Sequence, residues 1–153
     1  GVKRRQEILH ESEQTVVLSD FAHHPTAIAG ALESLRARWP DREILACFEP
    51  RSNTAVTNVF EDRFADALAL ADIALLGAVH RAEKIPEEKR INPANMIARI
   101  EESGKKGYFF STNSDLESFL AERESNQPCL VVFFSNGSFD GVIGRFAESV
   151  KNT

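Results

Sequence analysis

The residues best suited to chemistry lie in two short stretches, and each stretch directly follows an apolar run. Asp20, His23 and His24 follow the apolar run 15–18. The second stretch follows the apolar run 44–48 and contains Arg51, Ser52, Asn53 and Thr54. A carboxylate can accept hydrogen bonds from a pair of sugar hydroxyls, and a guanidinium can hold a carboxylate through two parallel hydrogen bonds. The first stretch by itself could simply cap a helix, but a second one in an equivalent position makes a ligand site the better interpretation.

Strands alternate with helices along most of the chain. The apolar periodicity predicts strands at 6–10, 15–18, 44–48, 73–76, 108–110 and 130–134. It predicts helices at 25–39, 59–71, 93–103, from about 114 onward, and at 141–150. Such alternation implies parallel strands joined by right-handed crossovers, and ligands bind at the carboxyl ends of these strands. Both chemically active stretches should therefore lie at the same edge of one sheet.

The strand pattern also predicts where individual strands lie in the sheet. The first two are separated by the short polar segment 11–14, which suggests an antiparallel hairpin at the sheet edge. The run 130–134 is the most continuous apolar one, which places it centrally. The fold predicted is an α/β, Rossmann-like, three-layer domain. Its mostly parallel sheet has about six strands with the antiparallel N-terminal hairpin at one edge, and it carries about five helices.

Polar residues mark several helix ends. Asn92 before Pro93 supplies a cap and a preferred first residue, and Gly104 supplies a stop. Asn58 is the expected N-cap of the helix 59–71, and the segment 114–117, Ser-Asp-Leu-Glu, has the spacing of a capping box.

Composition limits the class of protein. The 153 residues suit a single domain, and 42% hydrophobic with 27% charged residues is ordinary for a globular protein. A formal charge of -5 argues against a nucleic-acid partner. No apolar run approaches the roughly 20 residues that cross a bilayer, and the N-terminus lacks a signal-peptide core, so we expect a cytoplasmic location and no membrane contact. Cys47 and Cys129 lie inside strand-like runs and predict neither a metal site nor a disulfide.

Two further features bear on function. The polar segment 78–90 is longer than most connections after a strand, and the residues alone leave open whether it is functional or a solvated charged loop. The sequence contains no Gly-x-x-x-x-Gly-Lys-[Ser/Thr] phosphate loop and no Gly-x-Gly-x-x-Gly. Phosphate-binding chemistry must therefore come from elsewhere.

Four motifs in this order resemble the C-terminal domain of the Mur ligases, over essentially the whole chain. They are Gly-Val-Lys-Arg-Arg-Gln-Glu at 1–7, Asp-Phe-Ala-His-His-Pro-Thr at 20–26, Glu-Pro-Arg-Ser-Asn-Thr at 49–54, and Ser-Asn-Gly at 135–137. The resemblance is strongest to the branch that recycles cell-wall peptides in the bacterial cytoplasm. It implies that the chain is the third domain of such a ligase, a single domain over 1–153. The N-terminal UDP-sugar domain and the central ATPase domain would be its partners.

The resemblance implies an amide-forming reaction and a role for each candidate residue. ATP phosphorylates the carboxylate of UDP-N-acetylmuramate, and the amine of L-Ala-γ-D-Glu-meso-diaminopimelate attacks the acyl phosphate. Asp20 would accept hydrogen bonds from the ATP ribose, with His23 and His24 bordering the nucleotide. The incoming peptide would meet Arg51, Ser52, Asn53, Thr54, Arg81, Ser135, Asn136 and Gly137.

Catalytic groups, metal ligands and most contacts to ATP and Mg²⁺ would belong to the central domain, so this chain alone should be inactive. Departures from the family pattern at Ser19, 55–58, Ser138 and Asp140 leave the exact peptide open. Two other interpretations remain: the ligase that adds L-alanine to UDP-N-acetylmuramate, and a nucleotide- or peptide-binding module without catalysis. The run 51–54 favours the recycling enzyme.

Overall fold

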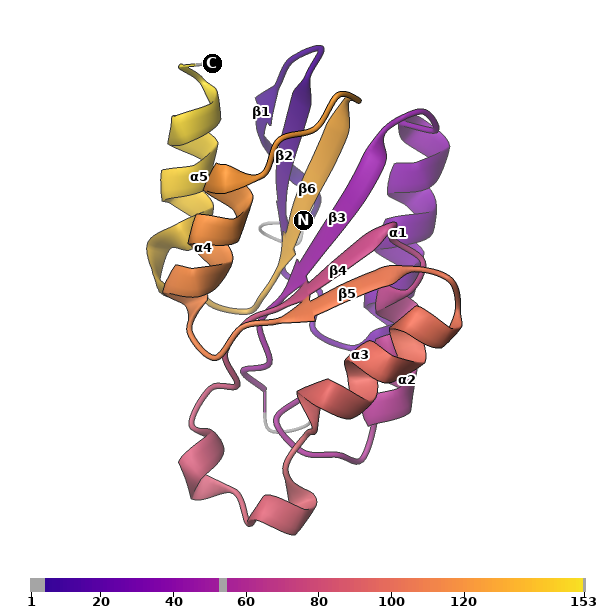
Figure 1. Cartoon of the computed structure of the whole chain (residues 1–153), viewed down its shortest axis with the longest axis vertical. Coiled ribbons are helices and arrows are strands. Elements are labelled where there is room, and N and C mark those ends of the chain that lie inside the picture. The colour runs from indigo at the N-terminus through magenta and orange to yellow at the C-terminus, as the bar shows by residue number, and fades with distance from the viewer. Residues whose placement is uncertain (1–4, 53–54, 153) are drawn as a thin grey trace.

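A six-stranded sheet lies between two layers of helices (Figure 1) in the computed structural model, which describes residues 5–52 and 55–152. The strand order is β1-β2-β6-β3-β4-β5. Only the β1–β2 pair is antiparallel, and the remaining neighbours are parallel. The strands are β1 (Glu7–Glu11), β2 (Thr15–Asp20), β3 (Glu43–Phe48), β4 (Ile73–Leu76), β5 (Lys106–Phe109) and β6 (Cys129–Phe134). The predicted fold class, the edge hairpin and the central place of 130–134 are confirmed.

Five α-helices cover the two faces of the sheet. One face carries α1 (Pro25–Arg38), α2 (Glu61–Leu68) and α3 (Pro93–Glu102), and the other carries α4 (Asn113–Glu122) and α5 (Val142–Val150) (Figure 1). Short 3₁₀ helices are η1 (Ala82–Lys84), η2 (Glu87–Lys89) and η3 (Phe139–Gly141). In the described part of the chain, no helix has the length and apolar character that crossing a membrane requires.

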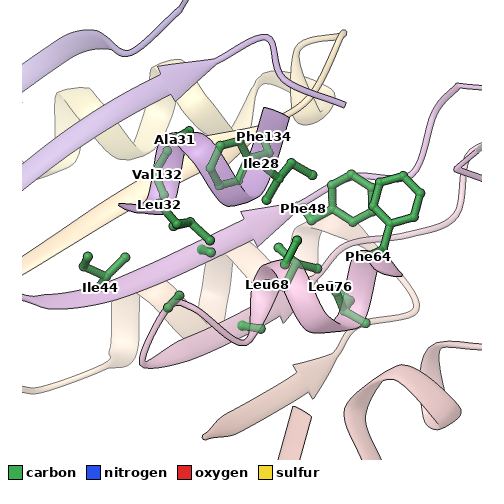
Figure 2. Close-up of a cluster of buried hydrophobic side chains, with 14 of the residues drawn as sticks. Ile28, Ala31, Leu32, Ile44, Phe48, Phe64, Leu68, Leu76, Val132 and Phe134 are labelled. Atoms are coloured by element: carbon green, nitrogen blue, oxygen red, sulfur yellow. The ribbon is translucent and has the colours of Figure 1, made fainter. Parts of the chain in front are cut away.

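Alternate residues of the inner strands point to opposite faces, so the core has two halves. In β3, Ile44, Ala46 and Phe48 pack toward α1 and α2, whereas Leu45 and Cys47 pack toward α4 and α5. Figure 2 shows part of the first half, where the Phe48 and Phe64 rings stack with centroids 4.9 Å apart. Burial on both faces explains why these strands read as continuous apolar runs.

Some helix ends lie where the sequence predicted them, and others do not. Asn92 caps α3 as predicted, since its side chain accepts a hydrogen bond from the Asn95 N–H. The prediction for α2 is wrong: the helix begins after Phe60 with no side-chain cap, so Asn58 is not its N-cap.

The capping box predicted at 114–117 is also wrong. The cap of α4 is Thr112, whose side chain accepts from the Asp115 N–H at 3.1 Å. The helix therefore begins at Asn113, and Ser114 already lies inside it. Threonine and serine both suit a helix cap, so the local sequence does not decide between the two positions.

Candidate functional site

Three neighbouring strands end together and bring the two chemically active stretches to one edge. Phe134, the last residue of β6, pairs with Asp20 of β2 on one side and with Phe48 of β3 on the other. Beyond the strands, the Ser135 N–H donates to the Asp20 carbonyl (3.2 Å) and the Glu49 N–H donates to the Phe134 carbonyl (3.1 Å). The predicted shared edge is confirmed.

The centre of this edge is the carboxylate of Glu49, which is only 3% exposed. Ser135 Oγ donates to its Oε1 at 2.7 Å, and Asn113 Nδ2 donates to its Oε2 at 2.9 Å. Asn113 also reaches two loops, because its Nδ2 donates to Asp140 Oδ2 (2.9 Å) and its Oδ1 accepts from the Ala78 N–H (2.9 Å). The sequence analysis missed both Glu49 and Asn113 as site residues. An acid directly between a fully apolar strand and Pro50 was the available signal for Glu49.

Arg51 lies against this network. Its Nη1 lies 3.7 Å from Glu49 Oε2, and its side chain remains 29% exposed. The side chain lies against the backbone of Gly137, where an added Cβ would come within 2.5 Å of Arg51 Nε. The Gly137 N–H donates to Ser135 Oγ at 2.9 Å. Three of the predicted substrate residues, Arg51, Ser135 and Gly137, therefore meet around Glu49.

The neighbouring predicted residues occupy the same loops. Ser52 begins a turn in which its Oγ accepts from the Ala55 N–H (3.0 Å) and its carbonyl accepts from the Val56 N–H (3.1 Å). Asn136 is half-buried between Ser135 and Gly137. Asn53 and Thr54 lie outside the described residues.

The predicted nucleotide residues lie at the turn from β2 to α1. Asp20 is 2% exposed, its Oδ1 accepts from the Ala22 N–H at 2.8 Å, and it lines a cavity of about 270 Å³ together with Arg5 and Gln6. His23 Nδ1 lies 3.0 Å from the Phe21 carbonyl oxygen. The rings of His23 and the exposed His24 have centroids 4.4 Å apart. The turn thus presents a carboxylate and two imidazoles within one short segment.

Arg81 stands apart from this cluster. It is exposed and has a left-handed backbone (φ 52°) before η1. The backbone N–H of the neighbouring residue His80 donates to the Pro50 carbonyl at 2.9 Å, which ties the start of the loop to the Arg51 segment. Among the described residues, no hydrogen bond or ion pair joins the Arg81 side chain to Glu49 or Ser135.

Two other features lie outside the cluster. A cavity of about 560 Å³, lined by Leu45, Leu120, Cys129 and Phe146 among others, opens at the amino ends of the strands, and no predicted site residue lines it. Within 5–52 and 55–152, no group of three or more His, Cys, Asp or Glu side chains is placed to hold a metal ion.

Comparison with known proteins agrees with the fold and identifies a family. The family model for the Mur ligase, glutamate ligase domain matches residues 4–137. A UDP-N-acetylmuramate–L-alanine ligase of Lactococcus lactis subsp. cremoris (strain MG1363) is 36% identical over 105 residues, which cover 69% of this chain and 23% of that protein. The chain therefore spans about a quarter of the length of this relative.

Solved structures show the same architecture. A murein peptide ligase from Psychrobacter arcticus 273-4 superposes with a TM-score of 0.74 at 28% identity, covering 100% of this chain and 31% of that one. A separately crystallised domain from Haemophilus ducreyi 35000HP, named for a UDP-N-acetylmuramate:L-alanyl-γ-D-glutamyl-meso-diaminopimelate ligase, superposes with a TM-score of 0.67 at 22% identity. It covers 95% of this chain and 99% of that one, and at this identity it shows the fold alone. Since the family model matches most of the sequence, the chain belongs to the Mur ligase family and corresponds to its glutamate ligase domain.

Proposed function

We propose that this chain is the third domain of an ATP-dependent cell-wall ligase, in which it contacts the ATP ribose and the incoming peptide. The reaction joins UDP-N-acetylmuramate to L-Ala-γ-D-Glu-meso-diaminopimelate in the bacterial cytoplasm. ATP transfers its terminal phosphoryl group to the muramoyl carboxylate. The peptide amine then attacks the acyl carbon, the amide forms and phosphate leaves. Domains that bind the UDP-sugar and the ATP phosphates would be supplied by the rest of the protein.

The observation that carries this proposal is the position of the Arg51 guanidinium. It lies 3.7 Å from Glu49 and beside Gly137, at the carboxyl ends of neighbouring parallel strands, where ligands bind in open α/β sheets. A guanidinium that these neighbours keep in place can take a peptide carboxylate with little loss of side-chain entropy. The adjacent loop 135–137 adds polar groups for the rest of the peptide. Arg81 is a second candidate contact, exposed in the neighbouring loop.

The ribose contact is assigned to Asp20. Its carboxylate lines a cavity beside β2 and α1, and a carboxylate suits two vicinal hydroxyls. His23 and His24 would border the nucleotide from the same turn. Mg²⁺ would be held by the domain that binds the ATP phosphates, since the described residues of this chain form no cluster of His, Cys, Asp or Glu side chains for it.

One observation favours a second candidate, the ligase that adds L-alanine to UDP-N-acetylmuramate. The relatives with the higher sequence identity, 36% in Lactococcus lactis, carry that name. The motif at 51–54 and the likeness to a murein peptide ligase support the recycling enzyme.

Phosphate release by the full-length enzyme, measured with UDP-N-acetylmuramate, ATP and either amine substrate, separates the two candidates. We expect kcat/KM for the tripeptide to exceed that for L-alanine by at least about tenfold, a difference of about 1.4 kcal/mol. The reverse order would identify the L-alanine ligase, and no phosphate release with either amine would favour a binding module.

Substitution of the candidate arginine tests the site itself. In the full-length enzyme, Arg51→Ala should raise the KM for the tripeptide and leave the KM for ATP nearly unchanged, because a charge-assisted bond is worth about 2 to 3 kcal/mol. Arg38→Ala is the matched control, since that arginine stacks on Trp39 at the far end of α1. An unchanged tripeptide KM in Arg51→Ala would remove this residue from the site.

A further inference from the structure

The buried acid Glu49 has no assigned role in the proposed contacts, yet it touches most of the loops that make them. Its Oε1 accepts from Ser135, which follows β6, and its Oε2 accepts from Asn113, which begins α4. Arg51, which follows β3, lies 3.7 Å from the same Oε2. One carboxylate thus joins segments that follow three different parts of the sheet.

Asn113 extends this connection to two more loops. Its amide nitrogen donates to Asp140 in the turn before α5, and its amide oxygen accepts from the Ala78 N–H after β4. Phe139 and Asp140 both have positive φ (56° and 55°), a conformation that costs energy in residues with a side chain. The bond from Asn113 helps to hold this turn, so the network links the segments that follow β3, β4 and β6.

Arg51 supplies the positive charge of this network, and its position depends on the groups around it. The backbone of Gly137 supports one side of the guanidinium, and Gly137 is itself held by Ser135 Oγ. Ser135 Oγ in turn donates to Glu49. Glu49 therefore acts on Arg51 twice, directly by charge and indirectly through Ser135 and Gly137.

We propose that Glu49 is a positioning residue, whose buried carboxylate fixes the Arg51 guanidinium for the incoming peptide carboxylate. This inference rests on the proposed function of Arg51. The carboxylate of Glu49 is removed from water and so interacts more strongly with a nearby positive charge, even though Arg51 is partly exposed. A rigid guanidinium loses less freedom when it binds. Neutralising Glu49 should therefore loosen Arg51 and weaken peptide binding without undoing the fold.

The chain offers an informative variant and a matched control. Glu49→Gln keeps the shape of the side chain: an amide oxygen can accept from Asn113 while its NH₂ donates to Ser135 Oγ, which can still accept from Gly137. The charge opposite Arg51 is lost, and the hydrogen bond with Ser135 is kept with its direction reversed. Glu43→Gln is the control, because Glu43 lies at the other end of β3, where it pairs with Arg123. Each variant thus removes the negative charge of one Glu–Arg pair, at one or the other end of β3.

The first readout is independent of any ligand. In the 153-residue chain labelled with nitrogen-15, the Arg51 Nε–Hε resonance, assigned by its loss in Arg51→Lys, reports how rigid the guanidinium is. We expect a rigid side chain in the wild type and in Glu43→Gln, and a mobile one in Glu49→Gln. A mobile Arg51 in the wild type would overturn the proposal even if Glu49→Gln did not fold, and so would an equally rigid Arg51 in Glu49→Gln.

The second readout is affinity for L-Ala-γ-D-Glu-meso-diaminopimelate, followed by the amide resonances of residues 135–137. Glu49→Gln should raise the Kd about tenfold, which corresponds to about 1.4 kcal/mol, whereas Glu43→Gln should leave it unchanged. An unaltered Kd in Glu49→Gln with a mobile Arg51 would show that positioning does not matter and would overturn the proposal. A third outcome is that the wild type does not respond to the peptide, although Arg51 is rigid only when Glu49 is charged. This outcome would contradict the proposed function, but not the positioning of Arg51 by Glu49.

Discussion

Two glycines, Gly77 after β4 and Gly137 after β6, show how the surroundings of one residue decide the effect of a methyl group. A Cβ at Gly77 would lie 2.6 Å from Asn113 Oδ1 and 2.8 Å from the buried ring of Phe139, and neither can move freely. A Cβ at Gly137 would instead meet the long side chain of Arg51, which is partly exposed and can move aside if its pairing with Glu49 is given up.

The same substitution should therefore have different costs at the two positions. We expect Gly77→Ala to lower the free energy of unfolding by about 1 to 3 kcal/mol, the usual effect of overpacking. Gly137→Ala should lower it by less than about 1 kcal/mol, because displacing Arg51 costs only a partly exposed ion pair. Urea denaturation of both variants measures the difference, and equal losses would contradict the contacts at Gly77.

The two cysteines differ in burial and should differ in reactivity. Burial raises the pKa of the Cys47 thiol far above its usual range. Burial also raises the pKa of Cys129, but a hydrogen bond with Thr15 opposes this effect and the residue is only partly buried. Since the thiolate is the reactive form, iodoacetamide at about pH 8 should modify Cys47 at least about tenfold more slowly than Cys129. Peptide mass spectrometry follows both sites, with the urea-unfolded chain as control. Equal rates in the folded chain would contradict the burial of Cys47.

At the scale of residues, the motifs identified part of the site and missed its centre. Arg51 and Ser135 were predicted because the motifs that contain them resemble those of the Mur ligases, and the structure brings the two residues together. Glu49 was missed because its role depends on partners 64 and 86 residues away in sequence. The local sequence marks Glu49 only as an acid between an apolar run and Pro50, and it does not show these distant partners.

At the scale of elements, the long loop between β4 and α3 is tied to the segment that follows the Arg51 motif. The Asn58 N–H donates to the Lys89 carbonyl (2.9 Å), the Ile91 N–H donates to the Val56 carbonyl (3.0 Å), and Asn58 Nδ2 donates to the Glu88 carbonyl (3.0 Å). These bonds lie in the part of the loop that follows η1. The loop and the segment 55–58 should therefore move together, and closure of the loop by itself is disfavoured.

Arg90 provides a test of this coupling. Its Nη2 donates to the Ile85 carbonyl at 2.8 Å, which closes the loop on itself. Arg90→Ala should speed amide exchange in 84–91 and also in 55–58, by about fivefold if one hydrogen bond of about 1 kcal/mol is lost. Hydrogen-exchange mass spectrometry measures both segments. Glu83→Ala, which removes an exposed side chain of the same loop, should change neither segment. Faster exchange confined to 84–91 would show that the two segments are independent.

Element boundaries were predictable where apolar side chains mark them. The inner strands were found because both of their faces are buried. β5 was predicted at 108–110 but lies at Lys106–Phe109, because Lys106 and Gly107 carry no apolar side chain. Gly107 belongs to the strand because it pairs with Ala74 of β4, and Ile97 of α3 packs over it with its Cδ1 3.0 Å from the position of an added Cβ. Such a tertiary contact leaves no local pattern in the sequence.

At the scale of the whole molecule, the two halves of the core share one sheet, and the candidate site lies where β2, β6 and β3 end. Because β6 is inserted between β2 and β3, residues from distant parts of the sequence meet at its end. The alternation of strands and helices predicted this edge, but not the order of strands along it.

The chain should not catalyse ligation alone, because its sequence lacks a phosphate loop. The purified 153-residue chain and the full-length enzyme would be compared with ATP, UDP-N-acetylmuramate and tripeptide. We expect phosphate release only from the full-length enzyme. Turnover by the chain alone would place the ATP-activating groups within it.

Nucleotide binding by the chain alone should be weak and should depend on the sugar. The one proposed nucleotide anchor is Asp20 with the bordering His23 and His24, and it would meet the ribose and not the phosphates. A millimolar Kd corresponds to a binding free energy of about 4 kcal/mol. A few polar contacts should give a net binding free energy of about this size once the free energy lost on association is subtracted. We therefore expect ATP and adenosine to bind with similar millimolar affinity, and Asp20→Asn to weaken both by the same factor. Calorimetric titration of the two ligands with the wild type and the variant measures this. Micromolar binding of ATP, or a strong preference for ATP over adenosine, would mean that phosphate contacts lie within this chain and that the ribose is not its main point of recognition.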